Sequence, residues 1–208
     1  NRLDASNGSF RRYVNQKSDP NSLSDDRVRA IAEDEHGMLW IGTLEGGLNQ
    51  LAPGAERFRR HRHEAGRASS LSDDGVHALL RDRAGRMWVG SRAALDLMTR
   101  EGEFLHYRHD PSNPWSLADS EVMSVFEDRG GVLWVGTRAA GVSRWNPATW
   151  SFGHVAAGVK GGEGLSNNYV TAFTEDGAGR LWVGTMGGGL NVFDRATGEV
   201  RHYRRDAT

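Results

Sequence analysis

The 208-residue sequence contains no cysteine, which excludes disulfide bonds, cysteine-based zinc sites and thiol nucleophiles. An excess of charge is also missing, because 26 Lys and Arg residues face 27 Asp and Glu residues, for a net charge of −1. This balance argues against a dedicated nucleic-acid or anionic-membrane binder, which normally carries a basic excess. No apolar run approaches the ~20 residues of a membrane-spanning helix. The longest runs, such as Val122–Phe126, have the length of a strand, and no signal peptide is visible.

Glycine, by contrast, is abundant: 27 of 208 residues, or about 13%, against the usual ~7%. Because the sequence is not of low complexity, this excess predicts many tight turns. Hydrophobic residues make up 38% and charged residues 25% of the chain, values that are ordinary for a globular protein. The length by itself is compatible with one large domain or two small ones.

One pattern occurs four times along the chain. Each copy begins with Asp-x-x-Gly and continues through a tryptophan to Gly-Thr or Gly-Ser. The tryptophans are 48, 46 and 48 residues apart, and a second series of mainly phenylalanines keeps the same spacing. The recurring residues of the pattern are Asp34, Asp82, Asp128 and Asp176, followed six residues later by Trp40, Trp88, Trp134 and Trp182. Self-similarity at a fixed period of this length is the signature of a repeat architecture.

Each unit carries four short, glycine-punctuated segments of strand character. The first is apolar and often β-branched, as in Val28–Glu33, and Asp-x-x-Gly then predicts a tight hairpin. Four antiparallel strands in ~48 residues are typical of a β-propeller blade. The sequence therefore predicts an all-β propeller fragment in a single partial domain, residues 1–208. It is divided into a leading half blade at 1–20 and blades at about 21–65, 66–112, 113–158 and 159–208.

The unit Asp-x-x-Gly-x-Leu-Trp-Ile/Val-Gly-Thr-x-x-Gly-Gly-Leu-Asn, preceded by Leu-Ser-x-x-x-Val, resembles the two-component regulator propeller repeat. The resemblance is clearest over Leu23–Arg60, Ser116–Phe152 and Leu165–Tyr203. It implies a sensing module from the extracytoplasmic region of a bacterial hybrid histidine kinase or diguanylate cyclase. It also implies a periplasmic location, with the membrane reached only through segments outside this chain. The second unit, which reads Ser91-Arg-Ala-Ala-Leu-Asp96, departs from the pattern because it lacks the Gly-Gly pair.

The start of the chain matches the middle of the last unit, since Asn1–Phe10 aligns with Asn191–Val200. The sequence therefore predicts that the chain opens inside a third strand and is a fragment of a longer propeller. An unpaired strand and an uncovered blade face predict association with the rest of the propeller or with a second copy.

The recurring aspartates and tryptophans are expected to build the scaffold. Asp suits the first position of a tight turn, and large aromatic side chains dominate core burial. We therefore expect the four aspartates to form turns and the four tryptophans to pack between blades. Three tryptophans do not recur, namely Trp115, Trp145 and Trp150, and Trp115 lies in a loop.

Specificity is expected where the units differ from one another. In a propeller, the loop that leads into the first strand and the loop between the second and third strands open on one face near the axis. Residues of mixed charge and aromatic character in such loops suit a small polar ligand, such as a charged saccharide. The candidate ligand-binding residues in these loops are Arg27, Glu45, Arg92, Glu121, Arg138, Tyr169 and Met186, and the loop tryptophan Trp115 is a further candidate outside this set.

Two alternatives to a ligand sensor stay open. The first is a protein-interaction or oligomerisation platform without a small ligand. The second is a propeller lyase or glycosidase that uses an axial pair such as His77 and Glu121. His61 and His63 lie on one side of a predicted strand, but zinc sites need three or four ligands. The sequence predicts no catalytic residue, no metal, no cofactor and no nucleic-acid partner.

Overall fold

The computed structural model describes residues 1–3, 6–146, 151–158, 164–195 and 197–205. Trp150 and the turn expected at residues 147–149 lie outside these ranges. The described residues form strands and turns, without a helix that has the length and hydropathy to cross a membrane.

Eighteen strands occur among the described residues, and sixteen of them form four-stranded antiparallel sheets. The first pair, which forms a separate hairpin, is β1 (Arg2–Leu3) and β2 (Phe10–Arg11). The first four-stranded sheet consists of β3 (Val28–Glu33), β4 (Leu39–Thr43), β5 (Leu48–Leu51) and β6 (Arg59–His61). The second consists of β7 (Val76–Arg81), β8 (Met87–Ser91), β9 (Leu95–Arg100) and β10 (Glu103–Tyr107). The third consists of β11 (Val122–Glu127), β12 (Leu133–Thr137), β13 (Val142–Asn146) and β14 (Ser151–Val155). The fourth consists of β15 (Val170–Glu175), β16 (Leu181–Thr185), β17 (Gly189–Phe193) and β18 (Val200–Tyr203).

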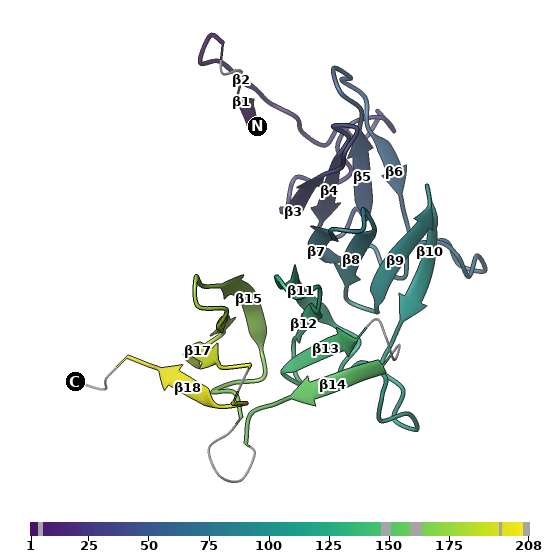
Figure 1. Ribbon diagram of the computed structural model, residues 1–208. Helices are drawn as coiled ribbons and strands as arrows, with labels where there is room; N and C mark the ends of the chain where they lie inside the picture. Colours follow the sequence, from purple (N-terminus) through teal and green to yellow (C-terminus); the bar gives the residue numbers. More distant parts are fainter. Residues whose placement is uncertain (4–5, 147–150, 159–163, 196, 206–208) are drawn as a thin grey trace.

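Each sheet is one propeller blade, with its strands hydrogen-bonded in chain order. The blades follow one another along an arc that is open on one side (Figure 1). The first strands β3, β7, β11 and β15 contact one another in succession and line the inside of the arc. Four complete blades and a leading half blade confirm the all-β propeller predicted from the repeat.

The hairpin between the first and second strands explains the Asp-x-x-Gly spacing. In the third blade, Gly131 has a φ of 80° and donates its N–H to the carbonyl of Asp128 at 2.9 Å. The Asp128 carboxylate accepts hydrogen bonds from the Val132 N–H at 3.0 Å and from the Trp134 Nε1–H at 2.8 Å. Glycine is required because a side chain is strained at this φ. The aspartate therefore forms the turn, as predicted, and in addition anchors the repeat tryptophan.

The same aspartate-to-indole hydrogen bond occurs in all four blades, at 2.8–3.1 Å. Indole Nε1–H is a donor that needs a partner when buried, and the carboxylate supplies one. From the sequence, the two residues were expected to have separate roles. Their constant separation of six residues was the signal that joins them.

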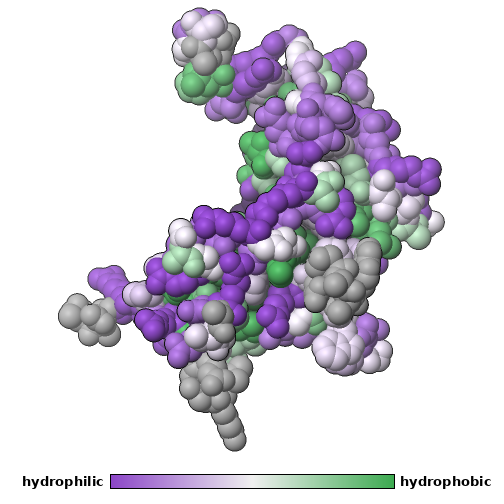
Figure 2. All heavy atoms as spheres, viewed as in Figure 1, coloured by the Kyte–Doolittle hydropathy of each residue, from purple (hydrophilic) through white to green (hydrophobic). Residues whose placement is uncertain are grey.

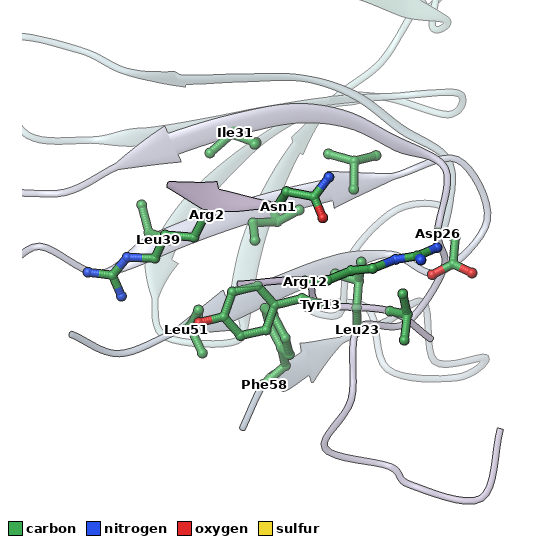
Figure 3. Close-up of a pocket in the computed structure, with 13 residues that line it drawn as sticks. Asn1, Arg2, Arg12, Tyr13, Leu23, Asp26, Ile31, Leu39, Leu51 and Phe58 are labelled. Carbon is green, nitrogen blue, oxygen red and sulfur yellow. The ribbon is translucent and has the colours of Figure 1, made fainter. Parts of the chain in front are cut away.

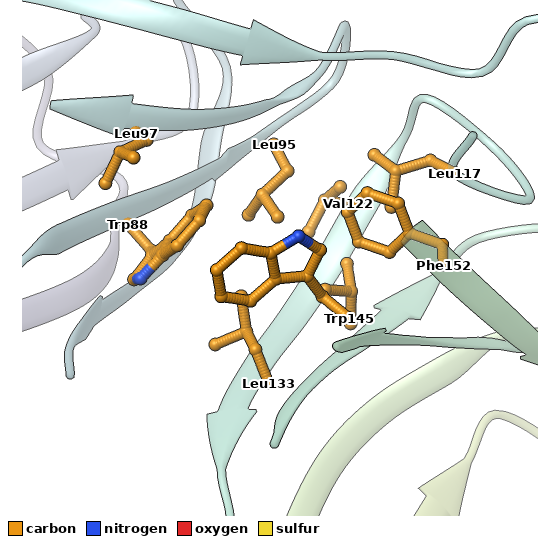
Figure 4. Packing of buried hydrophobic residues seen from close by; sticks show 9 residues of the cluster. Trp88, Leu95, Leu97, Leu117, Val122, Leu133, Trp145 and Phe152 are labelled. Atoms are coloured by element: carbon orange, nitrogen blue, oxygen red, sulfur yellow. The ribbon is translucent and has the colours of Figure 1, made fainter. Parts of the chain in front are cut away.

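The hydrophobic core lies between blades. Trp88 of the second blade packs against Trp145 of the third, with ring centroids 5.5 Å apart (Figure 4). Leu133 and Val135 of the third blade belong to the same cluster. Both tryptophans are only 1% exposed. The predicted packing of Trp40, Trp88 and Trp134 between blades is therefore observed, whereas Trp182 in the last blade is half-buried.

The departure of the second unit shortens one loop by a single residue. In the first and third blades, the N–H of Thr43 or Thr137 donates to the carbonyl of the glycine four residues later. In the second blade, the Ser91 N–H donates to the Ala94 carbonyl three residues later, at 3.0 Å. The loop therefore keeps its closing hydrogen bond without the glycine pair.

The second blade also contains a buried ion pair where the first and fourth blades carry asparagine. Asp96 is fully buried, and one of its oxygens lies 2.6 Å from His106 Nδ1. The other nitrogen of His106, Nε2, faces the Ala68 carbonyl at 2.8 Å. Both ring nitrogens can donate only in the imidazolium form. The hydrogen bond to Asp96 accordingly raises the pKa of His106, against an opposing effect of burial.

A raised histidine pKa makes stability depend on pH. The contribution of His106 is complete below its unfolded-state pKa of about 6.5 and is lost as pH rises through the higher folded-state value. We expect His106→Gln to lower the free energy of unfolding by roughly 1–3 kcal/mol at pH 6 and by less at alkaline pH. Urea unfolding between pH 6 and 9 measures this. His154→Gln is the control, because His154 faces the Ser143 hydroxyl in place of a carboxylate. An equal loss of unfolding free energy at pH 6 and at pH 9 would contradict the prediction.

Candidate functional site

The candidate site is the axial face, where two loops of each blade meet. In every blade, the residue after the second strand donates its backbone N–H to the residue before the first strand. These hydrogen bonds measure 2.9–3.1 Å. The pairs joined in this way are Leu44 and Arg27, Arg92 and Gly75, Arg138 and Glu121, and Met186 and Tyr169. Six of the eight predicted ligand-binding residues are thus placed by one repeated backbone contact, and Glu45 adjoins it.

In the first blade, Arg27 and Glu45 form an ion pair across the two loops, with Arg27 Nη2 2.6 Å from Glu45 Oε2. Arg27 also donates from Nε to Asp25 at 3.1 Å, and the Glu45 N–H donates to the same carboxylate. Burial by itself raises the pKa of Asp25, but the hydrogen bonds from Arg27 and Glu45 outweigh it and lower the pKa. A surface cavity of about 390 Å³ lies over this group, lined by Asn15, Ser24, Asp25, Asp26, Arg27 and Glu45.

In the third blade, the same two loops carry an ion pair of reversed order. Arg138 Nη1 lies 2.9 and 3.1 Å from the two oxygens of Glu121. This hydrogen bond is the main reason why the pKa of Arg138 is raised. The Arg138 side chain remains 57% exposed, so its other guanidinium nitrogens face solvent and can bind an anionic group.

Arg92 lies between the first and second blades. Its Nη2 donates to the Leu44 carbonyl of the first blade at 2.6 Å, and its Nε lies 3.7 Å from Asp73. Its side chain is 41% exposed. Arg92 therefore both joins the blades and keeps part of its guanidinium open on the axial face.

The fourth blade contributes uncharged groups at the equivalent positions. Met186 is 55% exposed, and its backbone is bonded to Tyr169. This side of the face is less polar than the first and third blades. The four blades thus present three kinds of chemistry at equivalent positions: ion pairs, a single arginine, and an uncharged pair.

His77 and Glu121 come close together although the sequence separates them by 44 residues. His77 lies on the inner strand β7, its side chain is 8% exposed, and its Nε2 is 3.8 Å from Glu121 Oε1. That nitrogen is buried and makes no hydrogen bond. Burial lowers the pKa of His77, opposed by the Glu121 charge. Imidazole and carboxylate are both groups that act as general acids or bases in enzymes.

Trp115 is separated from the other candidates. It is 63% exposed and lines a cavity of about 600 Å³ together with Asp128, Gly130, Trp134, Arg144 and Trp145. Asp128 and Gly130 belong to the turn between the first and second strands, which lies at the opposite strand ends from the axial loops. The structure therefore brings seven predicted ligand residues to one face and leaves Trp115 on the other side of the blade.

The histidine pair of the first blade has local partners. His61 Nε2 lies 3.1 Å from Gln50 Oε1, and His63 Nδ1 lies 2.9 Å from the Leu71 carbonyl. Burial lowers the pKa of His61. Among the described residues, no group of three or more His, Asp or Glu side chains is arranged to hold a metal ion.

The comparison with protein families gives one match. The model described as two component regulator propeller matches residues 22–45, 70–93, 116–139 and 164–187. Each matched segment runs from the loop before the first strand to the loop after the second strand. No curated protein sequence matches the chain.

Solved structures with the same fold include two from Bacteroides thetaiotaomicron. The extracellular domain described as part of hybrid two component system BT3049 is 26% identical, with a TM-score of 0.77 over 88% of this chain and 25% of that one. The extracellular domain described as part of one component system BT4673 is 20% identical, with a TM-score of 0.52 over 88% of this chain and 32% of that one.

An enzyme shares the fold as well. Virginiamycin B lyase from Staphylococcus aureus is 16% identical, with a TM-score of 0.62 over 87% of this chain and 56% of that one. At this identity the likeness concerns the fold alone. The chain spans about a quarter of the BT3049 domain, so the activity of a whole protein of that kind does not transfer with the match.

Proposed function

The chain is built from four repeats of the two-component regulator propeller family, and on this premise we propose that it is the ligand-sensing and signal-transmitting part of a bacterial membrane-bound sensor. The proposal gives this region no catalytic role, and it assigns the output to a histidine kinase or diguanylate cyclase outside this chain. The chain would lie in the periplasm. The similarity to the extracellular domain of a two-component system supports this placement.

The observation that carries the proposal is the chemistry of the axial face. The same backbone hydrogen bond joins the two loops of this face in each blade, while the side chains differ from blade to blade. A scaffold that repeats while its exposed side chains vary is suited to recognition, because the fold does not dictate those side chains. Arg92 and Arg138 keep exposed guanidinium groups there, which favours a small anionic molecule or an acidic saccharide.

Signalling would follow from binding between blades. A ligand held by Arg92 and Arg138 would contact more than one blade, and Arg92 already bridges the first two blades through the Leu44 carbonyl. If one packing of the blades binds the ligand more tightly than another, binding shifts the population toward it. A downstream membrane segment would carry this bias to the output domain.

A thermal-shift screen against neutral and uronic-acid oligosaccharides tests the proposal. We expect at least one acidic oligosaccharide to raise the melting temperature, because a ligand that binds only the folded state stabilises it. The double substitution Arg92→Ala and Arg138→Ala should then weaken binding of that oligosaccharide by about tenfold or more in calorimetry.

The matched control for this experiment is Arg100→Ala with Arg201→Ala. These arginines are 81% and 75% exposed and lie on β9 and β18, away from the axial loops. The control should bind as the unchanged chain does. A screen in which no oligosaccharide raises the melting temperature, or unchanged affinity in the Arg92 and Arg138 variant, would overturn the proposal.

The pair of His77 and Glu121 supports a second candidate, a lyase or glycosidase activity at the same face. Its support is the 3.8 Å separation and the buried, unbonded Nε2 of His77. The same screened oligosaccharides test it by chromatography for cleavage products. Products that disappear in His77→Ala would favour the enzyme, and their absence favours the sensor.

A further inference from the structure

One carboxylate of the axial face lies between a cation and an imidazole. Glu121 Oε1 is 2.9 Å from Arg138 Nη1, and the same oxygen is 3.8 Å from His77 Nε2. Arg138 and Glu121 belong to the third blade, whereas His77 lies on β7 of the second. The first distance is that of a hydrogen bond, and the second is about 1 Å too long for one. Glu121 is therefore bonded within its own blade and stands next to a second partner in the preceding blade.

This second partner has an unused hydrogen-bonding position. The His77 side chain is 8% exposed, and its Nε2 is buried without a hydrogen bond. A buried polar atom without a partner costs free energy, which a small movement of the neighbouring carboxylate recovers. If the imidazole is protonated, the same movement produces an ion pair with charge-assisted hydrogen bonding. His77 is therefore ready to bind Glu121 when Arg138 releases it.

A β-bulge sets the position of His77. The register between β7 and β8 shifts between Val76 and Ala78, which leaves His77 as the extra residue. A bulge re-aims the side chain that it carries. The first strand of every blade has the same irregularity, and the residues at it are Arg29, His77, Met123 and Thr171. Of these four side chains, only that of His77 changes its charge near neutral pH.

Charged groups from three blades act on His77. Burial is the largest effect and lowers the pKa of His77. Among the charges, Glu121 has the largest effect and raises this pKa. Arg29 of the first blade and Arg92 lower the pKa of His77, and Asp73 raises it. The position of the Glu121 carboxylate therefore decides, more than any other charge, whether the imidazole is protonated.

The first blade contains a similar ion pair in a different setting. Arg27 and Glu45 join the same two loops, and Asp25 holds Arg27 as well. Asp26 and Val28, on either side of Arg27, border a cavity of about 510 Å³ that is lined mainly by apolar residues (Figure 3). Hydrophobic residues are visible on this side of the first blade in Figure 2. Among the described residues that line the cavity, none is a histidine. The carboxylate between arginine and imidazole thus distinguishes the third blade from the first.

We propose that Glu121 is a switch between Arg138 of its own blade and His77 of the preceding blade. An anionic ligand that binds Arg138 competes with Glu121 for the guanidinium and repels the carboxylate. Glu121 then moves by about 1 Å onto His77 Nε2, and the imidazole takes up one proton from solvent. An ion pair within the third blade is thereby exchanged for an ion pair between the second and third blades.

This exchange gives the axial site a means of changing how two blades contact each other, and in this respect the inference rests on the proposed sensing function. Ligand binding raises the pKa of His77, because it brings the carboxylate closer. Affinity for the ligand is therefore highest below the pKa of His77 in the free protein. It falls as pH rises through the higher pKa of the bound state.

The pKa of His77, measured by NMR on the full chain with labelled histidine rings, tests the switch without a ligand. Arg138→Ala releases Glu121 and should raise the pKa of His77 by about one unit. In a Glu121→Gln background, the same substitution should leave the pKa unchanged, because Arg138 acts through the carboxylate. Comparison with His77→Gln assigns the resonance.

The matched control for this experiment is Arg27→Ala. It removes an arginine from the ion pair of the first blade, and the two arginine side chains are similarly exposed, at 53% and 57%. The control should leave the pKa of His77 unchanged. Arg138→Gln, which keeps a polar side chain, should reproduce the shift of Arg138→Ala, and circular dichroism should show folded protein for both. An unchanged pKa in the Arg138 variants, or an equal rise with and without Glu121, would overturn the switch.

A second measurement separates the switch from the sensing function. The acidic oligosaccharide that the thermal-shift screen selects is titrated by calorimetry at pH 6 and pH 8. We expect binding to be about threefold or more tighter at pH 6, and His77→Gln should remove this difference. Equal affinities at the two pH values would overturn the coupling while leaving the sensing function in place. A screen without any ligand would overturn the sensing function, and the NMR result still decides the switch.

Discussion

Replacing Trp88 by alanine is expected to lower the free energy of unfolding by about 3–5 kcal/mol. Trp88 is 1% exposed and contacts side chains of its own blade and of the next, including Trp145. The substitution removes the buried indole and leaves a cavity between two rigid sheets, which cannot move together without breaking their strand pairing. It also leaves the buried Asp82 carboxylate without the indole N–H that lies 2.8 Å away.

Urea unfolding followed by circular dichroism measures this loss. Trp115→Ala is the matched control, because it deletes the same side chain from a position that is 63% exposed. The control should change stability by no more than about 0.5 kcal/mol. Similar losses for the two variants would mean that the core between blades does not hold the fold together.

Asp128→Ala is expected to have an effect nearly as large, about 3 kcal/mol or more. The carboxylate is fully buried and accepts hydrogen bonds from the Trp134 indole and the Val132 backbone. It also pairs with Arg195 of the fourth blade. Removing it leaves the buried Trp134 indole N–H without its acceptor and takes from Arg195 one of its two carboxylate partners, the other being Glu175. This is more costly than the loss of the bonds alone.

The loss should also depend on pH. Burial raises the pKa of Asp128, but the hydrogen bonds from Trp134 and Val132 and the pairing with Arg195 outweigh it and lower the pKa. A lowered carboxyl pKa gives stability that is complete above the unfolded value of about 3.9 and is lost as pH falls below it. Asp128→Ala should therefore differ most from the unchanged chain at neutral pH and least near pH 3.

Asp176→Ala is the matched control for this experiment. Asp176 holds Trp182 in the same turn, but its side chain is 23% exposed, and its cation partner, Arg180, lies within its own blade. Water can solvate the groups that Asp176→Ala leaves, so its loss should be clearly smaller. Equal losses at the two positions would contradict the bridging role of Asp128.

The architecture was predictable because the repeat is written in residue types with strong local preferences. Asp34 and Gly37 specify a turn by themselves, and Val28–Glu33 specifies a strand by alternation and β-branching. Repetition four times then fixes the class of the fold, since a four-stranded unit of this length buries its faces only against other units.

The location of the candidate site was predictable from the sequence, but the contacts that its side chains make were not. Arg27, Glu121 and Tyr169 lie on one face, because each stands at the same position of its repeat and equivalent positions of the repeat come to the same place in each blade. The side-chain contacts between blades were not predictable. Arg92 donates to the Leu44 carbonyl of the first blade, and His77 lies close to Glu121 of the next blade. Such contacts depend on how blades are juxtaposed, which no local preference encodes.

The sequence by itself determined the unit, its strands, its turns and its number of copies, because hydrogen bonding within a blade connects residues close in the chain. Only the tertiary structure decided what happens between units. It packs Val76 on Gly42 of the preceding blade, and it brings the Asp128 carboxylate into contact with both Trp134 and Arg195. The physical reason is that close packing is a property of two surfaces together, and each surface acquires its shape only after its own blade has formed.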